Sequence, residues 1–280
     1  MENTNCYKVF DDRFTVDVIE KHDLVIEFSL TRLKFFIKTT KPVQIIWLED
    51  HFLGLENTIE QAIAKSKEII ESHDFVSANF WNSIKIVANS PFFCLVPSEL
   101  FDENLAPNYI YIAFPRLKKE NFTIQSKPIH TKDAQLVYAY PTAYLVLFSE
   151  IYLEKELKFS YSILELANHY NGKAEAKNRN IIVFEDKFLV LLYNSILSKK
   201  IRIEILPNQS KFFENFLKLY LKDGQIKTVV YGEITIFSKW YEILKKQGKA
   251  VEIGSKNMDT NLTQFFSETP DHRYWNLFLY

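Results

Sequence analysis

The sequence predicts an α/β protein built from two similar halves. One order of elements, three strands followed by a helix, a strand, a helix and a strand, occurs twice along the chain. The composition of 47% apolar and 25% charged residues is typical of a folded chain with a sizeable core. A length of 280 residues suits one large domain or two of ordinary size.

The first half begins with three apolar segments that are separated by short turns, which predicts three antiparallel strands. These segments are Leu24–Leu30, Leu33–Thr39 and Val43–Leu48. Asn57, with Glu60 three residues later, is the predicted N-cap of the following helix. A strand at Gln135–Ala139, a helix from Pro141 and a strand at Leu157–Ser160 complete the half.

The second half repeats this order. Its three predicted strands are Ile181–Phe184, Phe188–Tyr193 and Ile201–Leu206. A helix is expected between Pro207 and Gly224. A strand at Thr228–Tyr231, a helix at Thr235–Lys246 and a strand at Ala250–Ile253 follow.

The two halves differ by an insertion, which sets the expected domain boundaries. We expect the first half to cover residues 1–175, with an inserted subdomain at about 72–133, and the second half to cover 176–280. The inserted subdomain is predicted to hold strands and then a loop at Arg116–Lys132. Those strands are Ser83–Ala88, Phe92–Val96 and Tyr109–Phe114. Together the halves predict mixed sheets that are covered by helices.

The duplicated pattern with an insertion resembles the actin-like ATPase superfamily, whose core is ribonuclease H-like. The chain is also similar, over nearly its whole length, to a bacterial family known as domain of unknown function 3822. Three segments carry this similarity: Asp23–Ile37, Cys94–Phe101 and the strand, helix and strand that begin at Val229. The resemblance implies an actin-like fold and identifies no activity.

The resemblance also implies three nucleotide-binding elements, and the chain departs from each of them. Two glycine-containing hairpins should bind phosphate through backbone N–H groups, yet Glu27–Arg32 and Phe184–Phe188 contain no glycine. The adenosine-binding double glycine is reduced to Gly232, which also reads as an ordinary turn glycine. We therefore expect no ATP hydrolysis and no cofactor.

Candidates for other chemistry are few. The six histidines are widely spaced, without a pair at helical i, i+4 spacing, so no metal site is predicted. Asp50 and His51 should point apart as neighbours on a strand end. Acidic pairs are expected at turns, where they form local hydrogen bonds. These pairs are Asp11–Asp12, Glu49–Asp50 and Glu185–Asp186. No catalytic residue is predicted.

Composition argues against two classes of partner. A net charge of -1 gives no broad positive field for nucleic acid, and the chain has no apolar run of the length that a membrane span needs. Cys6 and Cys94 are too few for a disulfide framework and suit a reducing compartment. We expect a cytoplasmic location.

The C-terminal segment is rich in aromatic and apolar residues. It either packs on the second half or docks a protein partner, because aromatic anchors dominate interface energy. The candidate docking residues are Tyr274, Trp275, Leu277, Phe278 and Tyr280. The sequence thus favours a non-catalytic scaffold that binds an unknown protein. The alternative is a divergent nucleotide-binding enzyme, such as a kinase-like transferase of the same superfamily.

Overall fold

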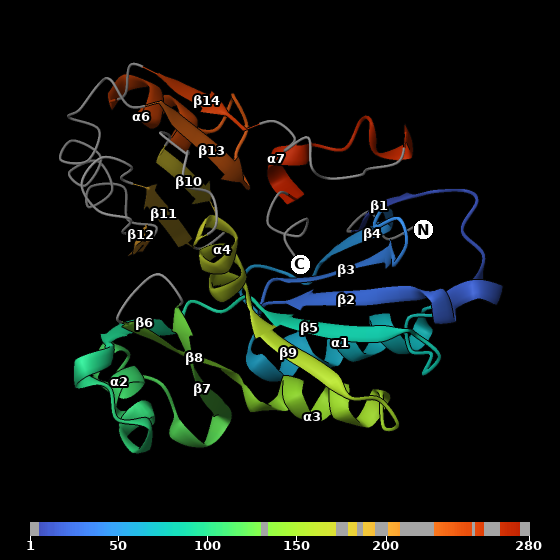
Figure 1. Ribbon diagram of the computed structural model, residues 1–280, viewed down its shortest axis with the longest axis horizontal. Helices are drawn as coiled ribbons and strands as arrows, with labels where there is room; N and C mark the ends of the chain where they lie inside the picture. Colours follow the sequence, from blue (N-terminus) through green and yellow to red (C-terminus); the bar gives the residue numbers. More distant parts are fainter. Residues whose placement is uncertain are drawn as a thin grey trace. The chain divides into compact units, whose positions relative to one another are not determined.

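The computed structural model describes residues 6–129, 134–171, 179–183, 187–193, 201–207, 227–247, 250–254 and 264–274. The chain forms two compact units (Figure 1). The first unit contains the strands β1 to β9, and the second unit contains β10 to β14 and most of α4. None of the described helices has both the length and the apolar character that crossing a membrane requires.

The first unit is built on a six-stranded sheet in the order β1-β4-β3-β2-β5-β9. Its strands are β1 (Cys6–Phe10), β2 (His22–Phe28), β3 (Arg32–Thr39), β4 (Ile45–Phe52), β5 (Ser83–Ala88) and β9 (Leu157–Tyr161). Strands β1 to β4 pair antiparallel, whereas β5 pairs parallel with both β2 and β9. The three predicted strands at the start of this half are confirmed, and β1 is an additional edge strand that the pattern did not predict.

Helices α1 (Ile59–Ser72) and α3 (Thr142–Ile151) lie side by side on one face of this sheet (Figure 1). Phe28 of β2 packs against Tyr144 of α3 with ring centroids 4.1 Å apart. The Tyr144 hydroxyl also lies 3.3 Å from Ser66 Oγ of α1. Apolar burial therefore fixes both helices on the sheet.

The start of α1 differs from the prediction. Thr58, not Asn57, is the N-cap, because its hydroxyl accepts the N–H of Gln61 while the Gln61 side chain accepts the Thr58 N–H. This reciprocal pair is a capping box that satisfies two free N–H groups. Asn57 instead donates to the carbonyl oxygens of Leu30 and Gly54.

A second, three-stranded sheet in the first unit corrects three predictions. Its order is β6-β8-β7, with β6 at Phe93–Pro97, β7 at Phe122–Ile129 and β8 at Ala134–Pro141. The predicted strand at Gln135–Ala139 thus belongs to this sheet, while Ser83–Ala88 belongs to the six-stranded one. The predicted loop at 116–132 contains β7, whose half-exposed polar residues hid the pattern.

Residues 109–114 were predicted as a strand, and that prediction is wrong. They lie mostly in α2 (Ala106–Ala113), which has a proline in its first turn, so the helical start outweighs the β propensity of Tyr and Ile. Ala106 and Ile110 pack on Val96, Val137 and Ala139 of the sheet. An inserted subdomain in the first half stays a prediction, for which this sheet after β5 is the candidate. The boundary at residue 175 also stays a prediction.

The second unit repeats the topology of the first. Its sheet has the order β12-β11-β10-β13-β14. The strands are β10 (Arg179–Val183), β11 (Lys187–Tyr193), β12 (Ile201–Pro207), β13 (Thr228–Gly232) and β14 (Val251–Ile253). This order matches β4-β3-β2-β5-β9, with the same antiparallel and parallel pairings. The predicted duplication is confirmed at the level of the sheets.

Among the described residues, the helices of the second unit are α4 (Ser162–Asn171, whose first residues belong to the first unit), α6 (Lys239–Gln247) and α7 (Asp271–Tyr274). Helix α6 begins four residues after the predicted start at Thr235, because residues 235–238 form a turn in which the Ser238 hydroxyl donates to the Thr235 carbonyl. The predicted helix between Pro207 and Gly224 lies outside the described residues.

Candidate functional site

The β2–β3 hairpin occupies the place where the resemblance implies a phosphate-binding turn. Its backbone N–H groups are bound by the chain itself: the hydroxyl of Ser29 accepts the N–H of Thr31 at 3.2 Å and of Arg32 at 3.0 Å. The Ser29 N–H donates to the Arg32 carbonyl at 2.9 Å. Donors that would wrap a phosphate in an open turn are therefore engaged within this one.

Neighbouring elements form hydrogen bonds with the backbone carbonyl groups of the same hairpin. The carbonyl oxygen of Ser29 accepts the Tyr144 hydroxyl at 3.0 Å, and that of Leu30 accepts the Asn57 amide at 3.0 Å. The carbonyl of Thr31 accepts the N–H of Leu53 at 2.8 Å. Within the described residues, every residue with positive φ is a glycine, and this hairpin contains none. The turn is thus fixed in an ordinary, closed conformation.

Charged side chains lie next to the hairpin on the sheet face opposite α1. The Arg32 guanidinium contacts Asp50 at 2.9 Å, and Lys34 contacts Glu27 at 3.5 Å. Glu27, Lys34 and Asp50 are all buried. These buried charges are paired with charges of opposite sign, so their burial is explained without a bound ligand.

Gly232 is the glycine that remains of the implied adenosine-binding turn, and the structure gives it a packing role. Its φ is +91°, and a Cβ atom at this position would lie 2.1 Å from the carbonyl oxygen of Val183. Val183 and Gly232 are parallel partners at the ends of β10 and β13. Only glycine fits this close approach. Of the second hairpin, residues 184–186 lie outside the described residues.

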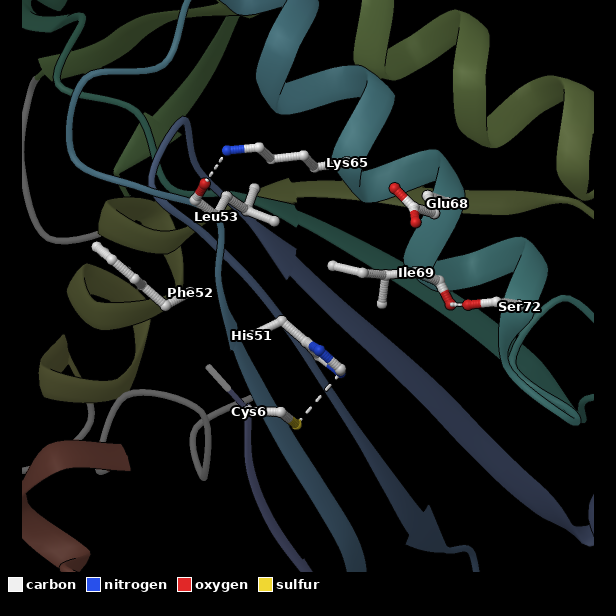
Figure 2. A pocket seen from close by; sticks show the side chains of 8 residues that line it. All are labelled: Cys6, His51, Phe52, Leu53, Lys65, Glu68, Ile69 and Ser72. Atoms are coloured by element: carbon white, nitrogen blue, oxygen red, sulfur yellow. Dashed lines mark hydrogen bonds between the residues drawn. The ribbon is translucent and has the colours of Figure 1, made fainter. Parts of the chain in front are cut away.

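A cavity of about 360 Å³ opens in the first unit between the end of β4 and α1 (Figure 2). Its lining residues are Cys6, His51, Phe52, Leu53, Lys65, Glu68, Ile69 and Ser72. Helix α1 supplies the wall from Lys65 to Ser72, and the Lys65 ammonium donates to the Leu53 carbonyl at 2.5 Å. The sheet forms the other wall, and on it Cys6 and His51 are the two side chains that can bind a metal ion or act as a nucleophile or base.

Sheet register brings these two side chains together. Cys6 lies directly opposite His51 in the β1–β4 pair, and its Sγ atom is 3.6 Å from His51 Nε2 (Figure 2). Glu49, two residues before His51, points to the same face of β4. Its Oε2 atom lies 2.8 Å from the same His51 Nε2. One sulfur, one nitrogen and one carboxylate oxygen therefore lie within 4.8 Å of one another.

Glu49 is the centre of a buried polar network. Its side chain is 3% exposed, and its Oε1 atom contacts Trp47 Nε1 at 3.0 Å, Lys8 Nζ at 2.9 Å and His73 Nε2 at 3.3 Å. Burial alone would raise the pKa of Glu49, but hydrogen bonds from His51, His73 and Lys8 outweigh burial and hold the pKa well below its usual range. The carboxylate is therefore ionised at neutral pH.

The Cys6 thiol is not arranged as a nucleophile. Burial, together with the charge of Glu49, raises its pKa to about 11, so it is protonated at neutral pH. A cysteine, histidine and acid relay uses both ring nitrogens of the histidine, whereas Nε2 of His51 faces both Cys6 and Glu49. Burial likewise raises the pKa of Cys94 to about 11.

The structure places the sequence-predicted residues as follows. Asp50 and His51 point apart, as expected, because Asp50 binds Arg32 while His51 binds Glu49. The prediction that Glu49–Asp50 form a turn is wrong, since both lie within β4. The Tyr274 side chain is fully buried, and the other docking candidates, Trp275, Leu277, Phe278 and Tyr280, lie outside the described residues.

Sequence reasoning missed the cluster of Cys6, Glu49, His51 and His73. Distance along the chain separates Cys6 and His73 from the other two, and no short motif joins them. The available signal was the i, i+2 spacing of Glu49 and His51, which puts both side chains on one face once the segment is recognised as a strand. The missing piece was β1, which brings Cys6 to this face.

Comparison with known proteins identifies the family. Residues 11–196 match the family described as "Protein of unknown function (DUF3822)". This range includes Asp23–Ile37 and Cys94–Phe101, and the segment from Val229 lies beyond it. None of the curated proteins compared with the sequence matches it.

Two solved structures show the same fold at low sequence identity. A protein with actin-like ATPase fold and unknown function from Bacteroides thetaiotaomicron VPI-5482 aligns with a TM-score of 0.70 and 17% identity, over 88% of this chain and 96% of that one. The PilM-PilN type IV pilus biogenesis complex aligns with a TM-score of 0.57 and 11% identity, over 92% and 96%. The chain therefore has the actin-like ATPase fold and belongs to the DUF3822 family of proteins of unknown function.

Proposed function

We propose that this chain is a non-catalytic actin-like scaffold that binds a protein partner and has a degenerate nucleotide site. The observation that carries the proposal is the closed β2–β3 hairpin. Its N–H groups at Thr31 and Arg32 are bound by the Ser29 hydroxyl. Phosphoryl transfer depends on donors that are already oriented toward the phosphate. A turn whose donors are engaged internally does not supply them.

The similarity to PilM supports the protein-binding half of the proposal. That structure is described as a complex in type IV pilus biogenesis, so a body of this fold serves there as one component of a protein assembly. We propose the C-terminal aromatic residues as the docking element. Because Tyr274 is buried, docking falls to Trp275, Leu277, Phe278 and Tyr280. The two free cysteines are consistent with a cytoplasmic location.

Thermal unfolding with nucleotide tests the degenerate site. A ligand at 100 times its dissociation constant stabilises a fold by about 2.7 kcal/mol. We expect the melting temperature in millimolar ATP with Mg²⁺ to equal the melting temperature in Mg²⁺ alone. A rise that grows with ATP concentration would overturn the proposal and favour the divergent enzyme instead.

Cross-linked capture from the cells that make this chain tests the docking role. The bait is the full chain, compared with a Trp275→Ala/Phe278→Ala double variant. Leu153→Ala is the matched control, because this side chain is also large and apolar and is 80% exposed. We expect one partner to be lost with the double variant and retained with the control. A partner that is retained by all three chains would exclude docking through the C-terminal segment.

A further inference from the structure

We propose that Cys6, Glu49 and His51 form a binding site for a divalent transition metal ion of the Zn²⁺ type, with one coordination position open to the cavity. The site is independent of the proposed scaffold function. Its ligands would be Cys6 Sγ, Glu49 Oε2 and His51 Nε2, which lie within 4.8 Å of one another. Within the part of the chain that the structure describes, no other group of three such side chains converges in this way.

One donor separation equals that of a tetrahedral ion, and a second is shorter by a small amount. Zinc bonds of usual length to sulfur and to imidazole nitrogen, at the tetrahedral angle, place these two atoms about 3.6 Å apart. Cys6 Sγ and His51 Nε2 are 3.6 Å apart. The Glu49 Oε2 to His51 Nε2 separation of 2.8 Å is a hydrogen-bond distance. A metal ion that replaces this bond would need these two atoms to separate by only about 0.6 Å.

The ligands are held by the backbone before any ion binds. Cys6 and His51 are directly opposed across the β1–β4 pair, and Glu49 precedes His51 by two residues on the same face. Sites built on paired strands keep their geometry better than sites on loops. The strand pairing therefore holds the three donors within 4.8 Å of one another, and side-chain movement would close the remaining separations around one ion.

Glu49 is also oriented by its surroundings in the way that metal-binding carboxylates usually are. Trp47, Lys8 and His73 all contact Oε1, and this leaves Oε2 directed at His51. Outer hydrogen bonds of this kind fix a ligand and tune its affinity. The Lys8 ammonium is on the Oε1 side, and its side chain is 42% exposed, so solvent screens its repulsion of an ion near Oε2.

The donor chemistry selects the class of ion. Thiolate and imidazole are the ligands of Zn²⁺ and similar transition metals, whereas Mg²⁺ and Ca²⁺ need oxygen ligands. The Cys6 thiol would lose its proton to solvent as the sulfur–metal bond forms. The charges of thiolate and carboxylate together balance those of the divalent ion.

The fourth position faces the cavity. Cys6 and His51 both line it, whereas Glu49 lies behind them and does not. A site with three protein ligands and one open position binds water or a small anion there, unlike closed structural sites with four protein ligands. Lys65 and Glu68 of α1 line the opposite wall (Figure 2), where the Lys65 ammonium is directed at the Leu53 carbonyl oxygen.

Titration of the chelator-treated full chain with Co²⁺ tests the site, because tetrahedral cobalt with a thiolate ligand has intense visible bands and a sulfur-to-metal charge-transfer band. We expect one ion per chain with both features. Cys6→Ser should lose the charge-transfer band, and Cys94→Ser, the matched cysteine control, should keep it. A weak octahedral spectrum, or a Cys6→Ser spectrum like that of the native chain, would refute the site.

A second measurement needs no variant and so does not depend on the folding of one. Alkylation of both cysteines is followed by mass spectrometry with and without stoichiometric Zn²⁺. We expect Zn²⁺ to slow the modification of Cys6 and to leave that of Cys94 unchanged. Equal Cys6 rates in the two samples would contradict metal binding by this thiol.

Discussion

Glu49 accepts a hydrogen bond at 3.0 Å from the indole nitrogen of Trp47, two residues earlier on β4. Both side chains point to the sheet face that α1 covers, because alternate residues of a strand share one face. Lys8 and His73 approach the same carboxylate oxygen. The indole thus belongs to a set of donors that keeps a buried carboxylate charged and fixes its orientation.

Glu49→Gln should destabilise the first unit in a pH-dependent way. Because the folded-state pKa of Glu49 lies below that of an unfolded glutamate, its ionised form stabilises the fold above about pH 4.3, and this contribution is lost as the pH falls further. Removing one partner of a buried charged network costs about 3 kcal/mol or more. Urea unfolding at several pH values, with chelator present, measures this free energy.

Glu68→Gln is the control for that experiment, since Glu68 lines the same cavity from α1 but is exposed. We expect it to change the free energy of unfolding by less than about 0.5 kcal/mol. The difference in free energy of unfolding between the native chain and Glu49→Gln should become smaller below about pH 4. A difference that stays constant with pH would show that Glu49 stabilises the fold by packing alone.

The two thiols should react slowly at neutral pH. Burial holds the pKa of both Cys6 and Cys94 at about 11, so the thiolate fraction at pH 8 is about a hundredfold below that of an ordinary cysteine. Alkylation by iodoacetamide in the presence of chelator should follow this fraction and accelerate as the pH rises toward 11. Glutathione serves as the reference thiol. Native-state rates that equal the reference at pH 8 would contradict this prediction.

The repeated order of elements could be predicted because each element has its own local sequence pattern. Leu33–Thr39 and Phe188–Tyr193 are apolar runs of strand length between turn residues, and both appear as strands, β3 and β11. The same local logic failed at Tyr109–Phe114. There the residue types favour a strand, but a proline in the first turn and burial of Ile110 select a helix.

The cavity cluster depended on information that local patterns do not carry. Cys6 and His51 meet only because β1 pairs with β4 in one particular register, and shifting that register by one residue would turn Cys6 to the other face. His73 reaches Glu49 from beyond the end of α1. The absence of glycine from the β2–β3 hairpin, in contrast, is visible in the sequence itself. The hydrogen bonds of Ser29 are visible only in the structure.

Trp47→Phe should weaken metal binding without removing a ligand. It deletes the N–H that orients Glu49 while keeping an aromatic ring in the core, and loss of an outer hydrogen bond typically lowers metal affinity by about 10- to 100-fold. Competition with a chromophoric chelator measures this affinity. Trp81→Phe is the matched control, because the Trp81 N–H donates to the Val76 carbonyl, away from the ligands. Equal affinities in the two variants would show that Trp47 does not act through Glu49.

Gly232→Ala should destabilise the second unit irrespective of nucleotide. The new Cβ atom would meet the Val183 carbonyl oxygen at 2.1 Å, and φ is +91°, so the strained backbone and the clash together should cost at least about 3 kcal/mol. Ile236→Ala is the control, since this side chain is 58% exposed and its loss should cost less than about 0.5 kcal/mol. Urea unfolding with and without ATP and Mg²⁺ measures both variants. If Gly232 served nucleotide binding instead of strand packing, the variant would unfold like the control without ATP and would differ from the native chain only when ATP is present.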